Sequence, residues 1–250
     1  MRAAQLKSAR FCVLVLMTAV MAIARAQVQS GIRIHMHGQD GYAADGLLYT
    51  PSSQPPFAAI VLIPDERGLT QRITDAGKRF AEAGFFAVAV DLNRGMAEQA
   101  TKPDGLQIQQ DLDAAFAYIA KQSDVKQEAI GAIGWGSGGL GALHLAVESR
   151  VTAVAVVGVP LPPESPHLAS LRAAVFAIFA GHDAAASPHS IKTFEAHLKT
   201  LAKTVEIKVY PNAERGFDDP EDSAHYSPAD SADSYHRAVQ FFSTRLITRR

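Results

Sequence analysis

The strongest constraint on this sequence is an alternation that starts at residue 58. Short apolar runs alternate along the chain with segments whose apolar residues recur at helical spacing. Such an alternation predicts an α/β domain, a mostly parallel, doubly wound sheet with helices on both faces. The runs are apolar at nearly every position, as expected for strands buried on both faces. The predicted strands span residues 58–63, 85–91, 130–135, 151–157, 173–179 and 205–210.

Helices are expected between these strands and after the last one. The apolar stripes that predict them are Ile73/Ala76/Phe80, Leu112/Ala115/Phe116/Ile119, Ile191/Phe194/Leu198/Leu201 and Tyr235/Val239/Phe242/Leu246. The last helix is expected to begin at Ser227, because Pro228 and Asp230 follow it as in a capping box. Two earlier segments, 32–37 and 47–50, are predicted to form an antiparallel edge hairpin that turns over residues 38–46.

The first 26 residues have the order of a secretory signal peptide. Basic residues precede an apolar run over 11–23, and Ala24-Arg25-Ala26 offers a cleavage site. The run of about 13 residues is shorter than the roughly 20 that a membrane-spanning helix needs. We therefore expect residues 27–250 to form one exported domain, periplasmic or secreted, with no stable membrane insertion after cleavage.

Charge and cysteine content narrow the partners of the mature domain. Cleavage removes four of the 24 basic residues and none of the 25 acidic ones, which leaves a net charge of about −5. Binding to nucleic acid is disfavoured by that charge. The only cysteine, Cys12, lies in the signal peptide, so the mature chain has neither a disulfide nor a thiol nucleophile.

The segment from Gly134 to Gly138 has the pattern of a nucleophile elbow. It joins a predicted buried strand to a predicted helix, and glycines flank its tip on both sides. The side chain at such a tip projects from the carboxyl edge of the sheet, where ligands bind in open α/β folds. The tip position here is Gly136, which has no side chain to attack a substrate.

Five segments together resemble the dienelactone hydrolases. They are the elbow region 130–142, the loop 64–69 with Asp65 three residues before Gly68, the segment 90–94, the loop 181–183 with Pro188, and the loop 210–217. The resemblance implies a single-domain α/β-hydrolase fold and hydrolysis of carboxylic esters or lactones. It also implies that the triad positions are Gly136 for the nucleophile, Asp183 for the acid and Arg215 for the histidine.

Two of these three positions hold residues that cannot perform triad chemistry. The triad base must take a proton from the nucleophile and return it to the leaving group. Arginine stays protonated at any ordinary pH, so Arg215 cannot do this. With Gly136 at the tip, both nucleophile and base are missing, and we expect Asp183 to form an ion pair with Arg215 instead.

Ser137 and His182 are the candidates to replace the missing groups. Ser137 follows the tip, but one step in a helical turn re-aims a side chain by roughly 100°, so a role in starting the helix is the simpler interpretation. His182 is next to Asp183, although neighbouring side chains on an extended loop usually point apart. His35 and His37 have a spacing also used by metal ligands, but no third ligand is evident and a solvated strand face explains them.

Three further residues are candidates to line a substrate pocket. Asp65 and Arg67 either pair with each other or meet a carboxylate ligand. Trp135, at the base of the elbow, either packs in the core or forms a pocket wall. We expect no cofactor and no metal.

Two hypotheses remain open at this level. In the first, the protein is a degenerate hydrolase that binds a small, possibly anionic ligand through Arg215 and does not cleave it. In the second, it is an active ester or lactone hydrolase that uses Ser137 with a displaced base. The expected partner in either case is a small-molecule ester, lactone or carboxylate.

Overall fold

The computed structural model describes residues 31–38, 41–94, 105–148, 150–161 and 166–248. The predicted signal peptide at residues 1–26 lies outside these ranges. No helix within the described ranges is long and apolar enough to cross a bilayer.

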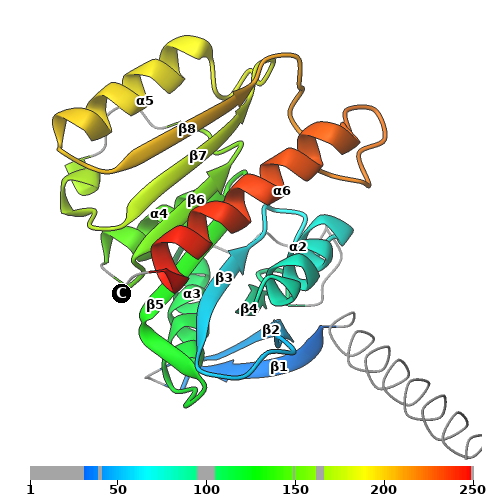
Figure 1. Cartoon of the computed structure of the whole chain (residues 1–250), viewed down its shortest axis with the longest axis vertical. Helices are drawn as coiled ribbons and strands as arrows, with labels where there is room; N and C mark the ends of the chain where they lie inside the picture. The colour runs from blue at the N-terminus through cyan, green and yellow to red at the C-terminus, as the bar shows by residue number, and fades with distance from the viewer. Residues whose placement is uncertain (1–30, 39–40, 95–104, 149, 162–165, 249–250) are drawn as a thin grey trace, which may run out of the picture.

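Eight strands form one mixed sheet in the order β1-β2-β4-β3-β5-β6-β7-β8 (Figure 1). The strands are β1 (Ile32–His37), β2 (Ala43–Tyr49), β3 (Phe57–Ile63), β4 (Phe85–Val90), β5 (Val125–Trp135), β6 (Ala153–Val157), β7 (Ala174–Ala180) and β8 (Val205–Tyr210). The pairs β1–β2 and β2–β4 are antiparallel, and the other pairs are parallel. The carboxyl ends of β3 to β8 therefore meet at one edge of the sheet.

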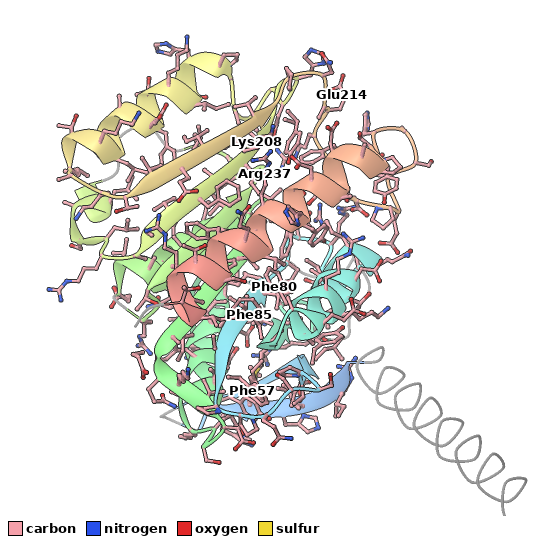
Figure 2. The ribbon with its side chains drawn as sticks, in the orientation of Figure 1. Phe57, Phe80, Phe85, Lys208, Glu214 and Arg237 are labelled. Atoms are coloured by element: carbon pink, nitrogen blue, oxygen red, sulfur yellow. The ribbon has the colours of Figure 1, made fainter. Side chains whose placement is uncertain are left out.

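Helices cover both faces of this sheet (Figure 1). They are α2 (Gln71–Glu82), α3 (Gly105–Ala120), α4 (Gly138–Val147), α5 (Pro188–Thr200) and α6 (Pro228–Phe242), followed by a π-helical turn (Ser243–Ile247). Side chains of α2 and α6 share one apolar core with the sheet, and those of α3, α4 and α5 share the other. Figure 2 shows Phe80 of α2 and Phe85 of β4, two aromatic residues of the first core.

The predicted α/β architecture is confirmed, and three strands start at least two residues away from the predicted position. The strand β5 starts at Val125 rather than residue 130, because Val125 pairs with Phe57 across a polar stretch that hides the strand in the sequence. The strand β2 starts at Ala43, so the hairpin turn is much shorter than residues 38–46. The strand β6 starts at Ala153 rather than 151. For β2 and β5, whose added residues are mostly poor strand formers, pairing with a neighbouring strand outweighs weak β-propensity.

The start of α6 matches the prediction in position but not in bonding. Ser227 occupies the N-cap position with Pro228 next to it. Its hydroxyl donates to Asp230 Oδ2 at 2.8 Å rather than accepting from a backbone N–H. The backbone N–H of Ser227 donates to the carbonyl oxygen of Phe217 at 2.8 Å, so the predicted capping box is not formed.

Candidate functional site

The elbow between β5 and α4 has the backbone of a nucleophile elbow. Gly136 at its tip has φ of +50°, in the left-handed region that strains residues with a Cβ. A Cβ on Gly134 would lie 2.2 Å from the carbonyl oxygen of Gly138, and one on Gly138 would lie 2.2 Å from that of Pro64. The flanking glycines thus allow the strand, the helix and the neighbouring loop to approach closely around a tip that lacks a side chain.

The place of the missing tip side chain is bordered by Asp65 and Arg215. A Cβ built on Gly136 would lie 3.2 Å from Asp65 Cβ and 3.5 Å from Arg215 Nη2. A guanidinium therefore occupies the region where a triad would present its base.

Asp183 lies beneath this guanidinium. Arg215 Nη1 is 3.8 Å from Asp183 Oδ1, an ion pair that confirms the predicted partner at a distance too long for a hydrogen bond. The Asp183 side chain is 2% exposed, and its Oδ1 also accepts from the backbone N–H of Ala185 at 2.8 Å. Its Oδ2 is buried without a hydrogen-bond partner, the position in which a triad acid would accept from histidine.

Ser137 uses its hydroxyl for a contact that the sequence did not indicate. The Oγ donates to Glu66 Oε2 at 2.8 Å, on the loop that follows β3. Ser137 holds the N-cap position of α4, but its side chain caps no backbone N–H. The prediction of a helix-starting role is therefore right in place, while the hydroxyl's partner is a carboxylate.

Two histidines near the site lie beside acidic side chains. His182 Nδ1 lies 3.6 Å from Glu214 Oε1 and its side chain is 59% exposed. His225 Nδ1 lies 2.9 Å from Asp222 Oδ2. Within the described residues, the recorded hydrogen-bond partner of the Ser137 hydroxyl is Glu66 and not a histidine. No hydrogen bond joins Ser137 Oγ to an imidazole in the described parts of the chain.

A cavity of about 410 Å³ opens above the elbow tip, and we call it the elbow cavity. Six carboxylates and three guanidiniums line it, together with the tip glycine and one histidine. Its polar lining is Asp65, Glu66, Arg67, Arg72, Gly136, Asp183, Glu214, Arg215, Asp218, Asp222 and His225. Glu214, labelled in Figure 2, follows the carboxyl end of β8, so the cavity lies at the edge of the sheet where ligand sites were expected.

Comparison with known proteins gives the family. The profile of the dienelactone hydrolase family matches residues 44–246. The chain belongs to the dienelactone hydrolase family. A carboxymethylenebutenolidase-like protein of Synechocystis sp. is 25% identical over 229 residues, covering 80% of this chain and 92% of the relative.

Two solved structures share the fold. A dienelactone hydrolase-like promiscuous phosphotriesterase from metagenomic libraries superposes with a TM-score of 0.76 at 20% identity, covering 86% of this chain and 99% of that one. A dienelactone hydrolase-type protein from Klebsiella pneumoniae gives a TM-score of 0.74 at 20% identity, covering 85% and 98%. The expected single-domain α/β-hydrolase fold is therefore confirmed for this member of the dienelactone hydrolase family.

Four residues that line the elbow cavity of this dienelactone hydrolase family member form a buried-charge cluster with Asp219; they are Asp65, Arg67, Arg72 and Asp218. Arg72 Nη2 donates to Asp65 Oδ2 at 2.5 Å, and Arg72 Nη1 lies 3.5 Å from Asp218 Oδ1. Arg67 bonds to Asp219 and lies 3.4 Å from Asp65, so the Asp65–Arg67 pair, one of the two alternatives, is present within a larger network, and both residues also line the cavity.

The cluster shifts the acidity of its carboxyl groups in opposite directions. Burial alone would raise the pKa of Asp65, but the guanidiniums of Arg72 and Arg67 outweigh it and hold that pKa below its usual value. Burial raises the pKa of Asp218 despite the opposing charge of Arg72. Asp65 is thus held as an anion, whereas Asp218 is less acidic than an exposed aspartate.

Trp135 anchors this cluster to the elbow. Its indole is 1% exposed, and Nε1 donates to Asp218 Oδ2 at 2.8 Å. Trp135 is therefore a packed core residue that supports the cavity floor, and it is absent from the residues that line the cavity.

Arg72 and the pair Asp218-Asp219 are site residues that the sequence reasoning missed. A signal for Arg72 was present, because it lies four residues before Ala76 on the apolar stripe of α2 and so had to be buried. No comparable signal marked Asp218 and Asp219. In the described parts of the chain, no three His, Cys, Asp or Glu side chains are arranged to hold a metal ion.

Proposed function

We propose that this member of the dienelactone hydrolase family is a catalytically degenerate hydrolase that binds a small monocarboxylate without turning over an ester. The proposal rests on two substitutions that occur together: Gly136 provides no nucleophile at the elbow tip, and Arg215 stands where a triad would present its base. Nucleophilic catalysis needs an attacking atom and a group that accepts its proton, and neither position supplies one.

Arg215 favours a carboxylate at the elbow tip. Its side chain is 49% exposed, and its recorded ion pair with Asp183 is long, so it has N–H groups available to a ligand. The N-terminus of α4 adds a partial positive charge next to Gly136. The acidic neighbours are already engaged, since Asp65 binds Arg72 and Glu66 accepts from Ser137.

The remaining charges limit how much negative charge a ligand can bring. Six carboxylates against three guanidiniums make the lining negative as a whole. A ligand with a single carboxylate is therefore favoured over one with two, because each further anionic group adds repulsion.

The second candidate function is hydrolysis of an ester or lactone through Ser137. The hydrogen bond from Ser137 Oγ to Glu66 Oε2 favours it, because a carboxylate can orient and weakly activate a hydroxyl. A carboxylate is a much weaker base than an imidazole, so this arrangement supports at most slow turnover.

Export to the periplasm or the extracellular space is part of the proposal and rests on the order of residues 1–26. Expression of the full chain in a bacterium with a secretory pathway should give a mature protein that begins at Gln27. Mass spectrometry of the periplasmic fraction tests this, and an uncleaved cytoplasmic chain would contradict it.

The functional proposal is tested by two assays on the purified domain. Hydrolysis of an aryl acetate should not exceed the uncatalysed rate, whereas turnover that disappears in Ser137→Ala would establish the second candidate function. Hexanoate should bind in calorimetric titration and lose at least about tenfold in affinity in Arg215→Gln, because a charge-assisted hydrogen bond is removed. Unchanged affinity in that variant would refute the role of Arg215.

A further inference from the structure

A second cavity, of about 230 Å³, lies beside the elbow cavity, and we call it the apolar cavity. Its walls are mainly hydrocarbon, from Ile63 at the end of β3, Leu92 after β4 and Ile108 in α3. Backbone of the first turn of α4 completes it at Gly138 and Gly141. The polar side chains in its lining are Asp65, Glu66, Asn93 and Ser137.

The two cavities are neighbours that share a border. Asp65 and Glu66 line both of them. Two consecutive residues line different cavities, since Gly136 lines the elbow cavity and Ser137 lines the apolar cavity. The hydrogen bond from Ser137 Oγ to Glu66 Oε2 lies at this border, and it holds the Glu66 side chain against the start of α4.

We infer that the two cavities hold one ligand, a monocarboxylate with a short unbranched hydrocarbon chain. This inference rests on the proposed function, which places the carboxylate at Arg215 in the elbow cavity. The hydrocarbon chain then passes Glu66 and Ser137 and ends between Ile63, Leu92 and Ile108.

The energetic basis is burial of the ligand's hydrocarbon. Each methylene that leaves water for an apolar wall should tighten binding by about fourfold. A second carboxylate at the far end of the ligand would meet the apolar wall of Ile63, Leu92 and Ile108, and the described residues that line the apolar cavity include no cation to compensate it. A longer hydrocarbon chain on the ligand should therefore increase its affinity for the protein, and a charge at the end of that chain should abolish the increase.

The experiment is calorimetric titration of the purified domain with propionate, butyrate, hexanoate and adipate. Affinity should rise about fourfold per added methylene from propionate to hexanoate. Adipate has the length of hexanoate with a second carboxylate at its far end, and it should bind no better than propionate.

Two substitutions in α3 test where the ligand's hydrocarbon chain binds. Ile108→Trp fills the apolar cavity and should remove the dependence of carboxylate affinity on the length of the ligand's hydrocarbon chain. Leu106→Trp is the matched control on the same helix, since Leu106 is 64% exposed and does not line the cavity, and it should behave as the wild type. Thermal melting of each variant verifies that it is folded.

The possible outcomes separate this inference from the proposed function. Binding of all monocarboxylates with equal affinity would overturn the two-cavity ligand and leave the role of Arg215 standing. Absence of carboxylate binding in the wild type would overturn the proposed function and this inference with it. Dependence on chain length that persists in Ile108→Trp would refute the assignment of the apolar cavity.

Discussion

Replacement of Arg72 by methionine should be among the most destabilising single changes in this domain. Arg72 is 5% exposed and contacts Asp65 at 2.5 Å, Asp218 at 3.5 Å and Asp219 at 3.8 Å. Methionine keeps much of the side-chain length but removes the charge. Because removal of one partner leaves buried carboxylates uncompensated, we expect a loss of about 3–5 kcal/mol in the free energy of unfolding.

The loss should depend on pH in a defined direction. Without Arg72, the pKa of Asp218 should rise further above its value in the unfolded chain, because burial already raises it. A group whose pKa is raised on folding contributes stability that is present at low pH and is lost as the pH rises through the folded-state pKa. The deficit of Arg72→Met should therefore be larger at pH 7 than at pH 4.

Urea unfolding followed by the fluorescence of Trp135, the only tryptophan, measures this effect. Arg237→Met is the matched control, because Arg237 pairs with Asp233 on the exposed side of α6 and such pairs contribute about 0.3–0.5 kcal/mol. A deficit of Arg72→Met below about 1 kcal/mol, or one that grows toward pH 4, would refute the reasoning.

Three further predictions concern stability. Burial raises the pKa of Asp111 to about 6, so its contribution to the free energy of unfolding decreases as the pH rises from 4 to 7. Asp111→Asn should flatten the dependence of stability on pH in this range, as measured by urea unfolding, and an unchanged slope would contradict this. Gly134→Ala places a Cβ against backbone and should cost about 1–3 kcal/mol, whereas Gly105→Ala, whose Cβ meets open space, should not destabilise the domain; equal melting temperatures would contradict this packing explanation. Trp135→Phe leaves Asp218 without its indole donor and should lower the free energy of unfolding by about 1–3 kcal/mol, as measured by circular dichroism melts. Unchanged stability in this variant would refute the anchoring role of Trp135.

The layered architecture was predictable because it depends on the alternation of apolar runs and helical stripes along the sequence. The continuous apolar run of β3 and the stripe of Ile73, Ala76 and Phe80 require burial, and every one of these residues is buried. Strand boundaries were less predictable because they depend on pairing partners. The start of β5 was missed because polar residues follow Val125, whose pairing with Phe57 of β3 is visible only in the folded chain.

The site was predictable where backbone geometry imposes a residue type. Glycines at 134 and 138 are required by close approach, so they marked the elbow in advance. The partners of Ser137 and Arg72 were not predictable, because Glu66, Asp218 and Asp219 come from loops whose positions only the folded chain defines. Side-chain networks between distant loops carry no periodic signal.

The proposed loss of hydrolysis rests on Gly136 at the elbow tip and Arg215 beside it, where a triad would present its nucleophile and its base. The most direct test is aryl acetate hydrolysis by the wild type and by Gly136→Ser combined with Arg215→His, which rebuilds the triad beside Asp183. The wild type should match the uncatalysed rate, and the rebuilt variant should exceed it by at least about 100-fold, a modest part of what a complete triad supplies. Wild-type turnover that equals or exceeds that of the rebuilt variant would contradict the account.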